Sequence, residues 1–254
     1  ALTVNTAGTT TFGAAVGGTN ALASVTTDSA GSVAINGGSV RTTGTQTYND
    51  AATLGANATF ATTNSNLLFG STLNSVTSAR TFSANVGTGN VTFTGTVGDS
   101  LALGNTSITA GTVTNSATWV GNGSYAITGA GVFNGAVSGI TTLSVSGAST
   151  IAANISSSGT QTYTGAVTLG ADTTLTSTGG LITFGSSLGN SSARALTISS
   201  GSGGVTFTGA VGSGTALGAI DLTTTGTTTI SSTMAAASFN GGAGTTAING
   251  GSIT

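Results

Sequence analysis

The chain has 254 residues, of which only eight are charged, three Arg and five Asp, giving a net charge of −2. His and Cys are absent, which excludes an imidazole base, a thiolate nucleophile and an ordinary zinc site, and the absence of Lys excludes a Schiff base and a polybasic surface. We therefore expect no catalytic residues, metal or cofactor, and no nucleic-acid partner. No apolar run approaches the roughly 20 residues of a membrane-spanning helix, so we expect no membrane insertion.

Small, hydroxyl-bearing and β-branched residues dominate the composition. Gly contributes 43 residues, and Thr and Ser together contribute 88. Stiff χ1 angles suit Thr, Val and Ile to strands, while the helix formers Glu and Lys are missing, so the chain is predicted to be all-β. Pro is also missing, which leaves exposed strand edges free to pair.

In chain order, a partial repeat at 1–43 precedes two large repeats near 44–158 and 159–254. The segment Gly44–Tyr48 (GTQTY) returns 115 residues later as Gly159–Tyr163. The two copies stay aligned, with one single-residue slip, through most of their length. Self-similarity at fixed periods is typical of repeat architectures rather than of one globular core.

The two ends of the chain are also copies of internal segments. Ala1–Thr3 matches Ala195–Thr197, and Ala34–Ser39 returns as Ala247–Ser252. Because the chain opens and closes inside a repeat, we expect 1–254 to be one continuous excerpt of a longer tandem array without polar end caps. We also find no charged n-region or apolar h-region after Ala1, so no signal peptide is predicted.

A shorter repeat runs through the chain, in which an aromatic residue is followed four positions later by a small or aliphatic one. Consecutive aromatics often lie 21 to 24 residues apart, as from Tyr48 to Phe69 and from Phe69 to Phe93. This spacing is too short for a domain and fits one turn of a solenoid. The clearest pairs are Phe12/Val16, Phe69/Leu73, Phe93/Val97, Phe133/Val137, Tyr163/Val167, Phe184/Leu188 and Phe207/Val211.

Alternation of apolar and polar side chains predicts strands at 162–169 and 205–211, each with one buried face. Clusters such as Asn36-Gly37-Gly38 and Ser199-Ser200-Gly201 separate the runs and supply the positive φ angles of tight corners. A β-sandwich is the competing all-β architecture, but it would not produce a repeat of 21 to 24 residues. The pattern favours a right-handed parallel β-helix (β-solenoid) of about 11 or 12 coils.

Several segments resemble the β-strand repeats of giant bacterial surface proteins of the filamentous-haemagglutinin type. They are TTGTQTYNDAATLGA, GTQTYTGAVTLGADTTLTS, ALTVNTAGTTTFGAAVGG and AINGGSV. The resemblance covers nearly the whole chain, with a less regular stretch at 112–139. It implies a secreted right-handed parallel β-helix that serves as an adhesin shaft or cell-surface fibre, and it implies no catalytic residues.

Two motifs invite a catalytic interpretation, and neither is favoured. Gly185–Gly189 fits the nucleophile-elbow pattern G-x-S-x-G around Ser187, but the chain has no His to act as its base. Asp50 and Asp172 would be the acids of a β-helical polysaccharide-active enzyme if they met across coils. We expect all five Asp residues to be solvated turn residues instead; the other three are Asp28, Asp99 and Asp221.

Three further features have a structural and a binding interpretation. Arg80 and Arg194 occupy equivalent repeat positions. They would either bind a carboxylate or a neighbouring protomer, or place a charge at an exposed corner, where it hinders aggregation. Thr-x-Thr pairs would order water in an ice-binding face or simply fill strand faces; they are Thr45/Thr47, Thr92/Thr94, Thr160/Thr162 and Thr206/Thr208. Asn-x-Ser/Thr sequons occur as often as chance predicts; they begin at Asn57, Asn90, Asn105, Asn122, Asn154 and Asn190.

Taken together, these patterns predict a non-catalytic structural or adhesive segment of a bacterial extracellular or cell-surface fibre. The expected partners are neighbouring repeats or copies of the chain joined end to end, together with host surfaces, abiotic surfaces or glycans. A binding module with an ice- or carbohydrate-binding face is the alternative, and a β-helical polysaccharide-active enzyme is the third. Scarcity of charge also predicts a stability that hardly depends on pH or salt.

Overall fold

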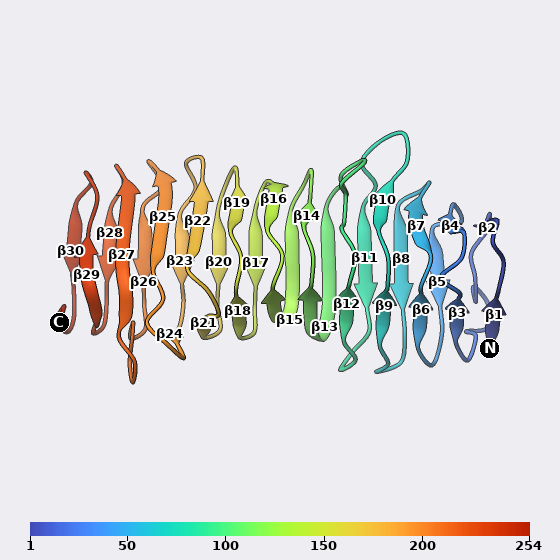
Figure 1. Cartoon of the computed structure of the whole chain (residues 1–254), viewed down its shortest axis with the longest axis horizontal. Helices are drawn as coiled ribbons and strands as arrows, with labels where there is room; N and C mark the ends of the chain where they lie inside the picture. Colours follow the sequence, from blue (N-terminus) through green and yellow to red (C-terminus); the bar gives the residue numbers. More distant parts are fainter. The chain divides into compact units, whose positions relative to one another are not determined.

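The chain folds into 30 short β-strands without a helix in a computed structural model of all 254 residues (Figure 1). The backbone winds as a β-solenoid of about 12 turns with about 21 residues in each turn. Two compact units, Ala1–Gly129 and Ala130–Thr254, meet within β15 (Tyr125–Phe133). In each unit the paired strands run parallel, which confirms the predicted parallel solenoid and excludes a hairpin-linked sandwich.

In the first unit, strands from successive turns stack in three columns, one for each side of the turn. The first column contains β1 (Leu2–Val4), β3 (Val25–Thr27), β6 (Gln46–Tyr48), β9 (Leu67–Phe69), β12 (Val91–Phe93) and the end of β13 (Thr106–Asn115). The second contains β2 (Thr9–Phe12), β4 (Ser32–Ile35), β7 (Ala51–Leu54) and β10 (Leu73–Ser75), and isolated bridges continue it to β14 (Trp119–Val120). The third contains β5 (Ser39–Arg41), β8 (Ala58–Ala61), β11 (Phe82–Asn85) and the start of β13.

The second unit also has three columns of parallel strands. The first contains the end of β15, β18 (Ser149–Ile151), β21 (Val167–Leu169) and β24 (Leu188–Asn190). The second contains β16 (Val137–Ile140), β19 (Ile155–Ser157), β22 (Thr173–Ser177), β25 (Leu196–Gly201), β27 (Leu217–Thr224) and β29 (Ala236–Asn240). The third contains β17 (Leu143–Val145), β20 (Gln161–Tyr163), β23 (Ile182–Phe184), β26 (Val205–Phe207), β28 (Thr228–Ile230) and β30 (Thr246–Ile248).

The strands predicted at 162–169 and 205–211 are each two strands on adjacent sides of a turn, so the predicted length was wrong. β26 ends at Phe207, and Val211 forms a bridge with Leu188 in a different column. β20 and β21 show the same break. The alternation of buried and outward side chains continues through the corner. The corner is three residues long, so the fourth residue after the aromatic points into the core again. The pattern therefore encodes strand, corner and strand rather than one longer strand.

Glycine occupies the corner after the aromatic strand because successive turns touch there. A Cβ atom on Gly209 would lie 2.5 Å from the carbonyl carbon of Ser186, and one on Gly165 would lie 2.3 Å from the carbonyl carbon of Gly147. Both distances are far inside van der Waals contact, so no other residue fits without moving the backbone. A second kind of corner uses the left-handed region, as at Gly204 between β25 and β26, whose φ is 76°. The cluster Ser199-Ser200-Gly201, predicted to separate two strands, lies at the end of β25 instead.

Aromatic rings stack along the inside of the third column of the second unit. The ring centroids of Tyr163 and Phe184 are 5.5 Å apart, and those of Phe184 and Phe207 are 5.2 Å apart, with interplanar angles of 15° and 2°. All three side chains are fully buried. The strand register places each ring directly beside the ring of the next turn. This confirms that like side chains from successive coils form a ladder in the core.

The first unit holds two aromatic ladders instead of one. Tyr48, Phe69 and Phe93 stack in the first column, at 5.0 and 5.6 Å. Phe60 and Phe82 stack in the third column, at 5.1 Å, and their edges meet the faces of the first ladder, as between Phe60 and Phe69 at 5.4 Å. Edge-to-face and stacked contacts of this kind pack aromatic rings into the centre of the turn.

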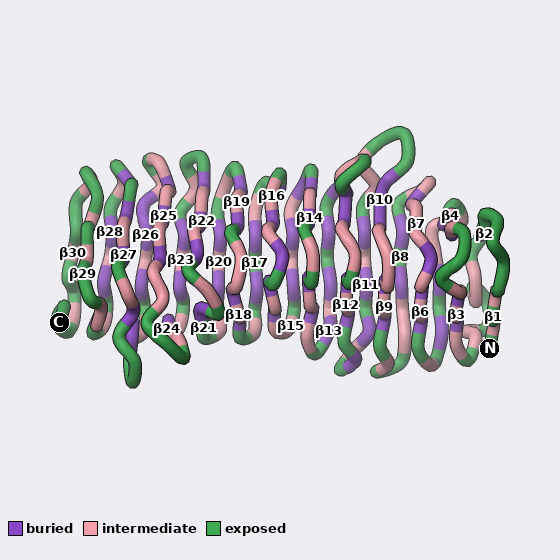
Figure 2. The backbone as a smooth tube through the Cα atoms, viewed as in Figure 1, coloured by how far each residue is buried: buried purple, intermediate pink, exposed green.

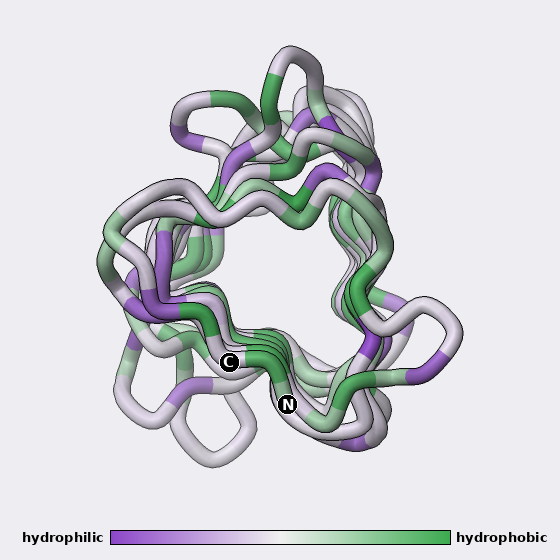
Figure 3. The backbone as a smooth tube through the Cα atoms, turned by 90° about the vertical axis from the view of Figure 1, so that its right-hand side faces the viewer, coloured by the Kyte–Doolittle hydropathy of each residue, from purple (hydrophilic) through white to green (hydrophobic).

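Side chains alternate between the core and solvent along the strands of both units (Figure 2). Most buried positions are aliphatic or aromatic, and most outward positions are Thr, Ser, Ala or Gly. Within each unit the turns of the backbone surround an interior, and the longer loops project away from it (Figure 3).

Candidate functional site

Ser187 lies half-buried in the corner before β24, without any group that could act as its base. Its carbonyl oxygen accepts a 2.8 Å hydrogen bond from the N–H of Val167, as part of the contact between successive turns. A nucleophile elbow is a sharp turn between a strand and a helix, and this unit contains no helix. The Gly185–Gly189 motif is therefore a solenoid corner.

Asp50 is buried, which corrects the expectation that every Asp is a solvated turn residue. It lies in the corner between β6 and β7, only 1% exposed, and neither carboxyl oxygen has a hydrogen-bond partner. The hydroxyl of Thr27, from the preceding turn, is also buried and lies beside it outside hydrogen-bond geometry. Position in a turn does not fix exposure, because this corner points its side chain between two coils.

Burial raises the pKa of Asp50 above its ordinary value because the charged form loses its hydration. The neighbouring Thr27 hydroxyl lowers this pKa, and the carboxylate of Asp28 raises it further. A raised pKa would suit a general acid. However, Asp50 is closed off from solvent, so no substrate reaches it.

Asp172 is exposed, and its Oδ1 accepts a 2.9 Å hydrogen bond from the N–H of Ala195 in the next turn. Asn57, at the equivalent position of the first large repeat, accepts the N–H of Thr81 in the same way at 3.0 Å. An amide that replaces a carboxylate in the same bond shows that the position needs an acceptor rather than an acid. Asp172 is thus a corner residue, and it lies in the second unit whereas Asp50 lies in the first.

The other three Asp side chains also accept hydrogen bonds, Asp28 and Asp99 at corners and Asp221 within β27, so the expectation that Asp221 is a solvated turn residue was wrong. Asp28 accepts a backbone N–H from the preceding turn. Asp99 accepts the hydroxyl of Thr96 at 2.9 Å, and this bond contributes most to holding the pKa of Asp99 below its ordinary value. Asp221 accepts Nδ2 of Asn240 at 2.7 Å. No three Asp side chains gather into a group that could hold a metal ion.

A groove of about 530 Å³ lies next to Asp221, over β27 and β29 of the second unit. Its walls offer threonine hydroxyls and one amide, but no acid, base or metal ligand. They are formed by Leu222, Thr223, Thr224, Thr225, Asn240, Gly242 and Ala243. The groove therefore has no group for acid–base chemistry.

Threonine forms an outward rank over four consecutive strands of the third column of the second unit, with Ser144 before it and Ala247 after it in the same register. Register places Thr162, Thr183, Thr206 and Thr229 directly beside one another in successive turns. The predicted Thr-x-Thr pairs do not form a second rank, because only one member of each lies within a three-residue strand and the other lies in the adjoining corner. On the first unit, Leu68 interrupts the corresponding rank between Thr47 and Thr92.

Asparagine side chains of four sequons join successive turns at corners. Oδ1 of Asn90 accepts the N–H of Thr112 at 3.1 Å, and the N–H of Asn90 itself is bound by Oδ1 of Asn66 at 2.9 Å. Asn57, Asn105 and Asn154 make equivalent bonds. The backbone groups at a corner face outward from the ladder, so a short amide side chain satisfies them. The sequence signal for this role is the recurrence of Asn at corners.

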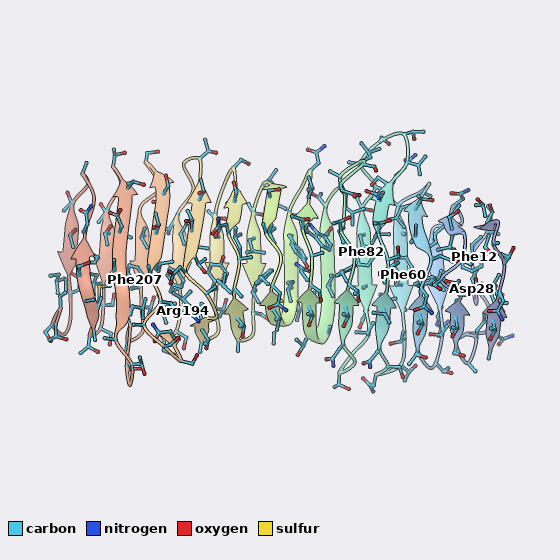
Figure 4. All side chains as sticks on the ribbon, in the orientation of Figure 1. Phe12, Asp28, Phe60, Phe82, Arg194 and Phe207 are labelled. Carbon is cyan, nitrogen blue, oxygen red and sulfur yellow. The ribbon has the colours of Figure 1, made fainter.

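Arg80 and Arg194 lie in the loops after β10 and β24, and the side chain of Arg194 is labelled in Figure 4. Both are half-buried, and in each the Nε atom is enclosed without an acceptor. The structure therefore places both residues in loops, at matching positions of the two large repeats.

The structure contains no helix that could cross a membrane. Comparison with protein-family models, characterised proteins and solved structures finds no match for the chain. The physical features of the solenoid itself must therefore support any assignment of function.

Proposed function

We propose that the chain is a non-catalytic structural segment of a bacterial extracellular or cell-surface fibre, of the filamentous-haemagglutinin type. Its role would be mechanical: it forms a stiff shaft that spaces an adhesive tip from the cell and self-associates into filaments. The observation that supports this proposal best is the continuity of backbone and side-chain ladders through each unit. Tyr163, Phe184 and Phe207 repeat the same buried contact from turn to turn.

Such ladders resist extension along the chain because each turn is bonded to both of its neighbours. Removing one turn breaks a full set of parallel backbone hydrogen bonds and exposes an aromatic ring at the same time. The few polar side chains that could serve an enzyme form hydrogen bonds between successive turns instead, as Asp172 does with the N–H of Ala195. This use of scarce polar groups supports a mechanical rather than a chemical role.

Single-molecule pulling tests the proposed role directly. A solenoid shaft should lose its turns one or a few at a time, each releasing about 21 residues, or roughly 70 Å of extended chain. Phe184→Ala should lower the force of the steps that involve its own turn, and Thr183→Ala, on the outward face of the same strand, should not. Extension without resistance, or one all-or-none event, would argue against a shaft. Electron microscopy of the purified chain tests self-association, which predicts thin unbranched threads rather than isolated particles.

The threonine rank at Thr162, Thr183, Thr206 and Thr229 favours a second candidate function, an ice-binding face. A regular rank of hydroxyl and methyl groups would order water along the column. Thermal hysteresis that is abolished by Thr183→Lys and retained by Lys placed on another face would favour this function. The absence of thermal hysteresis at high protein concentration would eliminate it.

A further inference from the structure

Arg80 lies near the end of the loop that follows β10, and hydrogen bonds hold both its backbone N–H and its carbonyl group. Its N–H donates to Oγ of Ser75 at 2.9 Å, and its carbonyl oxygen accepts the N–H of Gly104, in the next turn, at 2.8 Å. A Cβ atom on Gly104 would lie 3.3 Å from the Arg80 carbonyl, so glycine also allows this close approach. The loop thus holds the arginine in a defined place although its neighbours are exposed.

Arg194 is fixed in the same manner at the close of the loop after β24. With the amide of Asn190 oriented to satisfy both of its atoms, Oδ1 accepts the N–H of Arg194 at 3.2 Å. The carbonyl oxygen of Arg194 accepts the N–H of Gly218 at 2.8 Å. Asn190 and Gly218 occupy the repeat positions of Ser75 and Gly104, so the anchors persist although this loop is one residue shorter.

Neither guanidinium group is neutralised within the chain. Nη2 of Arg80 donates to the hydroxyl of Thr77 at 3.2 Å, but no carboxylate forms an ion pair with either arginine. The Nε atoms of Arg80 and Arg194 are both enclosed without an acceptor. Being enclosed, these Nε atoms cannot reach an external ligand, but Nη1 of Arg80 and both Nη atoms of Arg194 make no hydrogen bond within the chain and are not enclosed. These outer nitrogens are open to an external acceptor.

The loop before Arg80 is also held in an unfavourable conformation. Thr77 has a φ of 64°, in the left-handed region that a β-branched residue rarely adopts. Its hydroxyl donates to the Val76 carbonyl at 2.6 Å and accepts Nη2 of Arg80, so the strained residue positions the guanidinium group. Such strain is concentrated at binding and active sites because the surrounding contacts must maintain it.

We propose that Arg80 and Arg194, at equivalent repeat positions, each form a binding site for the carboxylate groups of an acidic polysaccharide, a polyuronate, with Thr77 positioning the guanidinium group in the first site only. The planar guanidinium fork matches a carboxylate, and exposed hydroxyls beside it match the hydroxyls of the sugar ring. Ser78 supplies such a hydroxyl in the first loop, and Ser191 and Ser192 supply them in the second. This inference goes beyond the mechanical role and does not depend on it.

Charge matching favours a uronate over a densely sulfated chain. Each site has a single cation, and the whole chain carries a net charge of −2, so no diffuse attraction to polyanions is available. One carboxylate on each sugar matches one guanidinium group in each loop. Sulfated glycans need clustered Arg and Lys, which this chain lacks.

Isothermal titration calorimetry with polygalacturonate at physiological salt tests the proposal, with fully methyl-esterified polygalacturonate as the neutral ligand. We expect binding of the acid and not of the ester. Arg80→Gln and Arg194→Gln should each halve the stoichiometry, and the double variant should weaken binding about tenfold or more. Arg41→Gln is the matched control, because it removes an equal charge from an exposed strand position and should leave affinity unchanged. Arg80→Lys should weaken binding, because Lys lacks the fork.

Arginine modification by phenylglyoxal provides a second measurement that needs no variant. Polygalacturonate should slow the modification of Arg80 and Arg194, read by mass spectrometry, and should not protect Arg41. The proposal is overturned by any of four results: no binding, equal binding of the ester, equal loss on Arg41→Gln, or protection of all three arginines alike. Stronger binding of heparin or polyglutamate than of polygalacturonate would also overturn it, since the ligand would then be a different polyanion.

Discussion

The hydroxyl of Tyr163 donates a 3.0 Å hydrogen bond to Oε1 of Gln161, although both side chains are fully buried. The amide nitrogen of Gln161 contacts the carbonyl oxygens of Ile155 and Thr176 at 3.4 and 2.8 Å, and the hydroxyl of Ser157 at 3.1 Å. A phenol and an amide are therefore buried together without leaving a polar atom of either unpaired.

The same pair recurs in the first unit, where Tyr48 donates to Gln46 at 3.1 Å. Nε2 of Gln46 contacts the carbonyl oxygens of Val40 and Ala61 and the hydroxyl of Thr42. Two separate copies keep the whole network, so the Gln-Thr-Tyr sequence is a structural unit. It fixes register, because a one-residue slip would bring Thr into the core in place of Gln and Tyr.

Replacing Tyr163 by Phe should destabilise the chain by about 1–2 kcal/mol, because Oε1 of Gln161 would remain buried without a donor. Gln161→Leu should cost more, since the Tyr163 hydroxyl and three acceptors would lose their partner. Urea unfolding followed by circular dichroism measures both changes. In a double-mutant cycle the two losses should sum to more than the loss of the double variant. Strict additivity would show that the buried network is not coupled.

Phe184→Ala should cost about 3–5 kcal/mol, because it removes a ring from the middle of a buried ladder and leaves a cavity. Phe184→Leu should cost clearly less, since the branched side chain refills part of the space. Hydrogen exchange should accelerate most in β20 and β26, the strands on either side. Thr183→Ala is the control on the outward face of the same strand and should change stability by less than about 1 kcal/mol. Equal effects at 183 and 184 would contradict the assigned faces.

The sequence was sufficient to predict the parallel stacking, but not which side of the turn each aromatic residue occupies. Phe12 carries the same aromatic-plus-four motif as Tyr48, yet it pairs with Ile35 in the second column of the first unit. Phe60 lacks the motif, since Asn64 follows it four positions later, and it still forms a ladder with Phe82, which has the motif with Val86. All three sides of a turn are short strands that begin and end at similar corners, so a local pattern cannot distinguish them.

Variable coil length adds to this ambiguity. Paired residues are 24 apart from Leu67 to Val91 but only 18 apart from Ser149 to Val167. Corner loops absorb the difference without changing the columns. The burial of Asp50 was unpredictable for a related reason: its exposure depends on how closely two neighbouring coils approach at one corner.

Gly209→Ala should be strongly destabilising, because its Cβ would lie 2.5 Å from the backbone of Ser186 and the two turns would have to separate. Gly189 provides a matched control in the same unit, since a Cβ there would meet nothing within 4 Å. Gly189→Ala should be neutral or slightly stabilising, by up to about 1 kcal/mol, through the lower entropy of the unfolded chain. Thermal unfolding of the two variants compares them directly. If both variants melted alike, close contact between turns would not be the reason for glycine at 209.

The scarcity of charge predicts an almost flat dependence of stability on pH, and Asp50 should cause the main departure. Its pKa is raised in the folded state, so the folded chain binds this proton more tightly than the unfolded chain does. The resulting stability is fully present below the ordinary Asp pKa and is lost as the pH rises through the folded pKa. Asp99 has the opposite sign: its pKa is lowered, so its contribution is present above the ordinary value and is lost as the pH falls.

Asp50→Asn should therefore stabilise the chain at pH 7, where the wild type buries an uncompensated charge, and should have little effect near pH 3, where Asp50 is already neutral. Asp99→Asn should show the reverse, with a loss at pH 7 that fades in acid. Urea midpoints measured from pH 3 to pH 8 for the wild type and both variants give the two slopes. Because Asn is nearly isosteric with Asp, a cavity cannot account for the difference. If Asp50→Asn were equally destabilising at every pH, the buried carboxyl group would serve an acceptor role that an amide cannot fill, and its protonation would not be linked to folding.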